Sequence, residues 1–158
     1  MIDDVSLKIL EILQEKARIP NVEVARQMDM APSAVLERIR KLERQGIIDG
    51  YEVRLNPDQF NRRLIAFVTV NVCEQKAKQP LGPYFAALRE IQEVHYVSGK
   101  DCYLLKVRVA DNGDLYRFLQ EKIILMAGVI HTQTTQVLHT FKETAKLPLT
   151  NSTVEQRN

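Results

Sequence analysis

The sequence predicts an α+β protein in which an N-terminal winged helix-turn-helix precedes a C-terminal ferredoxin-like βαββαβ sandwich. Up to Gly46 the apolar residues recur at helical spacing, whereas after Leu64 β-branched and aromatic residues alternate as they do in strands. Between these regions, the segment NPDQFNRR (56–63) contains a proline and two asparagines, which interrupt regular elements. The expected division is a first domain of residues 1–61, a second domain of residues 62–144 and a polar C-terminal tail of residues 145–158, which is expected to be frayed from Leu147 onward.

Composition and charge favour a globular intracellular protein. Of the 158 residues, 45% are hydrophobic and 27% are charged, which is ordinary for a folded chain. Cys73 and Cys102 form no disulfide-like pattern, and the start MIDDVSLKIL carries acids where a secretory signal carries positive charge. We therefore expect a cytoplasmic protein without a membrane segment. Because the net charge is only +2, any interaction with nucleic acid must depend on local patterning.

Two helices are predicted before residue 30. The first has acidic Asp3 and Asp4 at the end where the helix dipole favours negative charge. The second is the short segment NVEVARQM (21–28), in which Asn21 is placed to cap the helix and the small Ala25 permits close approach of another helix. The residues predicted to face inward are Val5, Ile9, Ile12, Leu13, Val24 and Ala25.

A third helix follows a tight turn at residues 28–30, in the stretch MDMAPSAVLERIRKLERQG (28–46). Pro32 suits its first turn because the missing N–H would be unpaired there, and Gly46 is a natural stop. Its buried stripe is predicted to be Val35, Leu36, Ile39 and Leu42. After it, IIDGYEVRLNP (47–57) predicts a two-stranded wing that turns at Asp49 and Gly50, where Arg54 would reach a duplex or solubilise an edge strand.

A short helix, a tight turn and a third helix together indicate a helix-turn-helix motif. This motif predicts that the third helix inserts into a DNA major groove. Small residues at its start permit close approach to the groove, and the cations beyond them would reach phosphates. The alternative is a solvated face held by local ion pairs. The candidate DNA-binding residues are Ser33, Ala34, Glu37, Arg38, Arg40, Lys41 and Arg44. Residues 1–63 contain eleven acidic and eleven basic residues, so tight binding requires paired copies.

The second domain is predicted from alternating strands and two amphipathic helices. The strands are LIAFVTVNV (64–72), VHYVSG (94–99), CYLLKVRVAD (102–111) and VIHTQTTQVLHTF (129–141), and the helices are PLGPYFAALREI (80–91) and DLYRFLQEKIILM (114–126). In this βαββαβ order both helices cover one face of an antiparallel sheet. The other face needs a partner, which predicts a homodimer.

The chain resembles a full-length member of the Lrp/AsnC (feast/famine) family of transcription regulators, from its first helix to about residue 144. The matching stretches are DDVSLKIL, VARQMDMAPSAVLERIRKLERQGIIDGY, SGKDCYLLKV and GVIHTQTTQVL. The resemblance implies DNA binding by the first domain. It also implies a second domain of the RAM/ACT type that dimerises, associates into tetramers or octamers, and binds an amino acid between dimers.

Two departures from the family pattern concern function. Ala31 stands where the family usually has a serine that caps the recognition helix, and Cys102 stands where the effector loop usually has an acid. An amino-acid effector needs a partner for its ammonium group and donors for its carboxylate. The resemblance implies these candidate effector-binding residues: Gly99, Lys100, Asp101, Cys102, Tyr103, Thr132, Thr134 and Gln136.

Two other functions compete with an effector-controlled regulator. Some proteins resembling this family decarboxylate tetrapyrroles, but that chemistry would need a degraded recognition helix, and this helix keeps its cations. The other is an architectural protein that compacts DNA without an effector. No cofactor is expected, and His95, His131 and His139 lack the cysteine or acid at ligand spacing that a metal site would need.

Overall fold

The computed structural model describes residues 2–99 and 101–149, which form two compact units. The second unit is Leu55–Lys142, and the first combines the chain before it with the chain after it. The boundary therefore falls after Arg54. The sequence pattern had predicted it near Asn61. The reason is a short 3-10 helix, Pro57–Phe60, which is capped by the Asn56 side chain and belongs to the second unit.

Three helices make the first unit: α1 (Asp4–Glu15), α2 (Asn21–Met28) and α3 (Pro32–Arg44). Their core confirms most of the predicted inward-facing residues, and its buried members are Ile9, Leu13, Val24, Ala25, Val35 and Ile39. Val5 and Ile12 pack at its margin. Ala25 is 2% exposed, and its small methyl side chain lets α2 approach its neighbours closely.

The helix ends confirm part of the predicted capping. Asp3 caps α1 by accepting a 2.7 Å hydrogen bond from the backbone N–H of Ser6. Asp29 adopts the left-handed conformation after α2, with φ 51°, and provides the predicted tight turn. The prediction for Asn21 was wrong, because this residue is the first of α2 and the N-cap position is occupied by Pro20. The extended backbone of Pro20 ends the preceding loop without a side-chain cap.

The predicted β wing was wrong in its secondary structure. Residues 47–56 contain no strand, and Gly50 lacks the positive φ that the predicted hairpin turn requires. Gly46 instead has φ 66°, which turns the chain back so that the N–H groups of Ile47 and Ile48 bond the carbonyl of Leu42 at 2.9 and 3.3 Å. These hydrogen bonds hold the chain at the end of α3, and residues 51–56 form no regular element.

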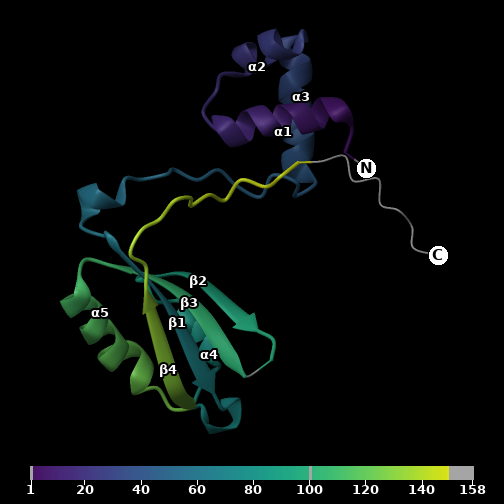
Figure 1. Ribbon diagram of the computed structural model, residues 1–158. Helices are drawn as coiled ribbons and strands as arrows, with labels where there is room; N and C mark the ends of the chain where they lie inside the picture. The colour runs from purple at the N-terminus through teal and green to yellow at the C-terminus, as the bar shows by residue number, and fades with distance from the viewer. Residues whose placement is uncertain (1, 100, 150–158) are drawn as a thin grey trace. The chain divides into compact units, whose positions relative to one another are not determined.

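The second unit has the predicted order of strands and helices. Figure 1 shows its four strands side by side, and their order in the sheet is β2-β3-β1-β4 with every pair antiparallel. Its elements are β1 (Leu64–Val72), α4 (Leu81–Ala86), β2 (Ile91–Val97), β3 (Cys102–Val109), α5 (Asn112–Phe118) with a π-helical extension (Leu119–Ile124), and β4 (Val129–Gln136); a 3-10 turn, Glu74–Lys76, follows β1.

Both helices of this unit pack on one face of the sheet. The core between the two layers is formed by alternate strand residues together with helical side chains, namely Ala66, Val68, Val70, Val72, Leu81, Phe85, Leu105, Val107, Val109, Leu115, Phe118 and Ile123. The intervening strand residues face away from the helices. This arrangement confirms the predicted sandwich.

The helix predicted for residues 80–91 is shorter in the structure. It ends at Ala86, and Ile91 begins β2 by pairing with Val107 of β3. In addition, the N–H of Arg108 donates a 2.7 Å hydrogen bond to the carbonyl of Glu90. Hydrogen bonding with β3 thus places Glu90 and Ile91 beside this strand, although the apolar spacing had predicted that they would be helical.

The tail was predicted to be frayed from Leu147 onward, but Leu147 itself is held by the first unit. Lys146 forms an ion pair with Glu15 of α1 at 2.7 Å, and both backbone polar groups of Leu147 bond the Gln14 side chain. Residues 143–149 therefore belong to the first unit. The remainder of the predicted tail lies outside the described residues.

Candidate DNA-binding and effector-binding sites

The candidate DNA-binding residues divide into an exposed strip and a flank on α3. Because Val35, Ile39 and Leu42 are buried, the opposite side of the helix faces solvent. The exposed strip consists of Ser33, Glu37, Arg40, Lys41 and Arg44. Ala34 and Arg38 are half-buried at its flank, one helical turn apart. The strip places a small residue near the start of the helix and three cations near its end.

Arg38 is held by the first helix. Its Nη1 donates to Asp3 Oδ2 at 2.7 Å and to Ser6 Oγ at 3.3 Å, and its side chain is 34% exposed. The hydrogen bond from Arg38 is the largest cause that lowers the pKa of Asp3 well below its usual value, and the N–H of Ser6 lowers it further. Asp3 therefore caps α1 and anchors α3 through the same carboxylate.

This anchor predicts a pH-dependent contribution to stability. Because the pKa of Asp3 is lowered in the folded protein, its contribution is present above the ordinary value of 3.8 and is lost as the pH falls toward the folded value. Asp3→Asn keeps a good capping residue but removes the charge. We expect the Tm difference between wild type and Asp3→Asn to be constant near neutral pH and to shrink below pH 3.8. A Tm difference between the two proteins that is as large at about pH 2 as at about pH 7 would contradict this role.

The N-terminus of the recognition helix lacks a side-chain cap. Ala31 occupies the N-cap position with φ −69° and ψ 138°, the extended conformation that a capping serine also adopts. Ala31→Ser should therefore satisfy a free N–H of the first turn without moving the backbone. We expect it to raise the free energy of unfolding by about 1 kcal/mol in urea denaturation of the full chain. Ala31→Val is the control, since valine cannot accept this hydrogen bond; an equal gain for both variants would exclude capping.

The candidate effector-binding residues do not converge within one chain. Residues of β3 and β4 lie on opposite sides of β1, since Val70 pairs with Tyr103 on one side and with Thr132 on the other. Cys102 is buried and points to the face opposite Tyr103. Thr134 and Gln136 are exposed on the edge strand, Gly99 and Asp101 are exposed in the β2–β3 turn, and Lys100 lies outside the described residues.

A cluster of tyrosines and carboxylates surrounds the end of the β2–β3 hairpin. The hydroxyl of Tyr96 donates to Asp101 Oδ1 at 2.8 Å, and the hydroxyl of Tyr103 donates to Glu74 Oε1 at 2.7 Å. The two rings meet edge to face with centroids 5.1 Å apart. Burial, together with the bond to Glu74, raises the pKa of Tyr103 to about 12.

Sequence reasoning missed three members of this cluster. Glu74 comes from the turn after β1, Tyr96 comes from β2, and Gly82 comes from α4. A Cβ atom at Gly82 would lie 3.3 Å from the Tyr103 ring, so glycine gives that ring its space. Glu74 and Gly82 carry no local signal, because folding alone brings them to Tyr103. Tyr96 lies next to the predicted loop, and its position could have suggested a role.

Neither a metal centre nor a membrane helix is found in the described part of the chain. Residues 2–99 and 101–149 contain no group of three or more histidine, cysteine, aspartate or glutamate side chains arranged to hold a metal ion. Within the same ranges, no helix has both the length and the apolar character needed to cross a bilayer.

Comparison with known proteins identifies the family. Residues 65–147, more than half of the chain, match the model of the Lrp/AsnC ligand binding domain. The chain belongs to the Lrp/AsnC family. Residues 2–49 match a winged helix-turn-helix DNA-binding model, which covers the three helices of the first unit. This Lrp/AsnC protein is therefore a DNA-binding transcription regulator.

Relatives of this Lrp/AsnC protein match nearly its whole length. It is 38% identical over 148 residues to the leucine-responsive regulatory protein of Escherichia coli K12, covering 92% of this chain and 90% of that protein. It is 35% identical over 150 residues to the protein of the same name from Haemophilus influenzae, covering 94% and 90%. Among solved structures, a Neisseria meningitidis transcriptional regulator in complex with L-Met is 29% identical, with a TM-score of 0.86 over 94% of this chain and 97% of that chain.

Proposed function

We propose that this regulator binds operator DNA in the cytoplasm as a homodimer that assembles further into tetramers or octamers, and that an amino acid or related metabolite controls it. The observation that carries the proposal is a recognition helix joined to a sandwich whose sheet has one face without helices. One neutral DNA-binding domain holds DNA weakly, and a dimer supplies two.

The dimer forms through the uncovered face of the sheet. Phe67 lies near the middle of this face on β1, between Lys106 of β3 and Thr135 of β4 in the strand register, and it is 37% exposed. Leu104 and Thr69 form the next paired row on this face. An apolar centre bounded by polar residues is the composition that a protein–protein interface favours.

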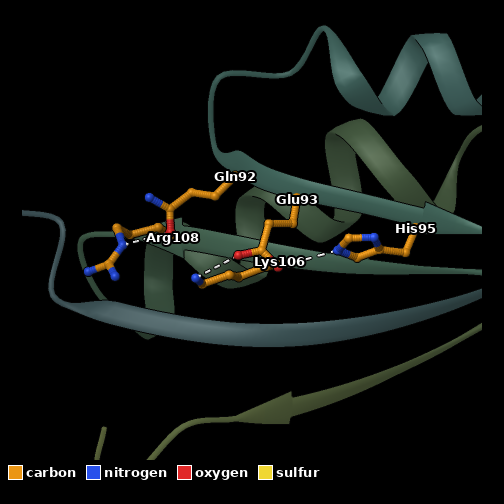
Figure 2. Close-up of polar contacts among 5 residues, drawn as sticks. All are labelled: Gln92, Glu93, His95, Lys106 and Arg108. Carbon is orange, nitrogen blue, oxygen red and sulfur yellow. Dashed lines mark hydrogen bonds and ion pairs between the residues drawn. The ribbon is translucent and has the colours of Figure 1, made fainter. Parts of the chain in front are cut away.

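Charged groups on this face are neutralised by neighbours on the same chain. Figure 2 shows Lys106 of β3 directed toward Glu93 of β2, with its Nζ 2.9 Å from Glu93 Oε1, while the other oxygen lies 3.3 Å from His95 Nε2. The bond from Lys106 lowers the pKa of Glu93, and His95 lowers it further. A lysine only 13% exposed, already paired with an acid, can be covered by a second sheet at lower cost than an unpaired charge.

The dimer would present two recognition helices to successive major grooves about one helical turn apart. In this arrangement Ser33, Ala34 and Glu37 lie nearest base edges, and Arg40, Lys41 and Arg44 contact phosphates. Arg38 is already paired with Asp3, so its main contribution is to hold the helix on α1.

The effector would bind near the β2–β3 hairpin of one dimer and β4 of another, since one chain does not bring these elements together. The carboxylates of Asp101 and Glu74 are suited to an ammonium group, and Thr132, Thr134 and Gln136 offer donors for a carboxylate. Effector binding controls assembly only if its affinity differs between the oligomers.

A thermal-shift screen of the twenty standard amino acids against the full-length protein tests effector binding. A ligand that binds only the folded state raises Tm, by the equivalent of about 2.7 kcal/mol at a concentration 100 times its Kd. We expect at least one amino acid to raise Tm and to change both the oligomer distribution and DNA affinity. If no amino acid raises Tm, or if the effective one changes neither quantity, amino-acid control is excluded.

Binding to a promoter fragment tests the DNA-binding part separately. We expect the affinity for duplex DNA to fall steeply as the salt concentration rises, because phosphate contacts release counterions. Affinity that is independent of salt would contradict the assigned recognition surface. A long footprint that no amino acid alters would instead favour the architectural alternative.

A further inference from the structure

A single side chain of α1 binds the backbone of the C-terminal segment. Gln14 Nε2 donates to the carbonyl of Leu147 at 3.1 Å, and Gln14 Oε1 accepts from the N–H of Leu147 at 2.7 Å. One amide group thus satisfies both backbone polar groups of one residue, as a neighbouring β-strand would. We call this pair of hydrogen bonds the Gln14 clamp.

The clamp is a stronger candidate for a specific role than the ion pair beside it. Lys146 Nζ lies 2.7 Å from Glu15 Oε2, but the Glu15 side chain is 74% exposed, and exposed ion pairs contribute little because water and salt screen them. Gln14 is half-buried and its two hydrogen bonds are neutral, so salt affects them less. Replacing Gln14 therefore tests directly how Leu147 is attached to α1.

The clamp gives the DNA-binding unit a second attachment. The chain leaves this unit after Arg54 and returns to it at Glu143. If residues 143–149 were free, only the connection after Arg54 would limit the orientation of the DNA-binding unit. With Leu147 held on α1, the intervening unit is tethered at both of its ends, and closing this loop removes conformations available to a single flexible linker.

We propose that Gln14 is a positioning residue for DNA binding: by clamping Leu147 it limits the orientations in which the dimer presents its two recognition helices. Gln14 lies on α1, and the recognition surface is on α3. Its effect is therefore on the relative placement of two DNA-binding units and leaves the affinity of each for a half-site unchanged. The inference rests on the dimeric DNA binding proposed above.

The test uses full-length Gln14→Met, which keeps the size of the side chain but forms neither hydrogen bond. Duplexes enriched from a random pool by the wild-type protein provide a two-half-site ligand, into which five base pairs are inserted between the half-sites. This insertion turns one half-site by about half a helical turn, and we expect it to weaken wild-type binding about tenfold or more. For Gln14→Met we expect a loss of less than about threefold, because freer units can follow the displaced half-site.

Two further variants separate the clamp from a general effect on α1. Gln14→Glu keeps an acceptor for the N–H of Leu147 but loses the donor to its carbonyl, so its tolerance of the insertion should be intermediate. Glu11→Met introduces the same side chain at an exposed position of the same helix and should behave as the wild type. All variants should bind a single half-site with equal affinity.

Trypsin cleavage after Lys146, measured without DNA, reports the clamp itself. Cleavage should be faster in Gln14→Met than in wild type and Glu11→Met, because the segment must leave α1 to enter the protease. Equal cleavage rates, or an equal penalty for the insertion in wild type and Gln14→Met, would overturn the positioning role. If the wild type enriches only single half-sites, dimeric DNA binding fails as well, even where the cleavage rates show that the clamp is present.

Discussion

Phe67→Asp is expected to convert the regulator into monomers and to weaken DNA binding about 100-fold or more, because the two linked DNA-binding domains are separated. The side chain lies on the sheet face opposite the core, since its neighbours Ala66 and Val68 are fully buried among the helices. A single chain can therefore fold with a carboxylate at this position. Across a two-fold axis, however, the substitution places charge in an apolar interface, at a cost of several kcal/mol (roughly 3 or more).

Light scattering after size-exclusion chromatography measures this effect, and circular dichroism checks that the chain remains folded. Tyr116→Asp is the matched control, because Tyr116 is an aromatic residue of α5 that is 67% exposed on the helix-covered side of the sheet. We expect the control to remain dimeric. A dimeric Phe67→Asp protein would place the interface elsewhere.

Replacing Arg40, Lys41 and Arg44 together with alanine is expected to abolish most of the salt dependence of DNA binding. Each phosphate contact contributes a slope of about 0.9 to the dependence of log affinity on log salt concentration. Three such contacts in each of two protomers predict a decrease in slope of roughly five. At low salt the affinity should fall by about 1000-fold or more for all sequences alike, since phosphate contacts carry little sequence information.

Fluorescence anisotropy over a range of salt concentrations measures both quantities. The control replaces the exposed Lys76, Lys78 and Lys122 of the second unit with alanine. It removes the same number of positive charges, but none of them is on α3. Its slope should stay close to that of the wild type. Equal slopes for the two triple variants would mean that net charge, and not the exposed strip of α3, governs binding.

Most of the core of the DNA-binding unit could be predicted from the sequence. Val24, Ala25, Val35 and Ile39 are buried as expected, because helical periodicity is a local property that can be read over a few turns. The order of strands in the second unit was equally accessible, since alternation along each segment indicates a strand whatever its partner. The family resemblance added the functions of the two domains, and the family comparison confirms it.

The predicted secondary structure was wrong where hydrogen bonds to other parts of the backbone outweighed the local sequence pattern. Apolar spacing continued the helix after Ala86, but hydrogen bonding with β3 made Ile91 the start of a strand. Asp49 and Gly50 suggested a hairpin, yet the positive φ falls at Gly46 and returns the chain to Leu42. A periodic pattern indicates which secondary structures a segment can form. Hydrogen bonding with distant parts of the chain then determines which of them is present in the folded protein.

The sequence by itself determined the fold class and the helix-turn-helix, because both follow from periodicity and composition. Only the tertiary structure decided which polar residues are already engaged. Asp3 pairs with Arg38 across 35 positions of sequence, and Gln14 meets Leu147 across 133. Such pairs leave no periodic trace, since a hydrogen bond depends on an approach of about 3 Å that only the folded chain establishes.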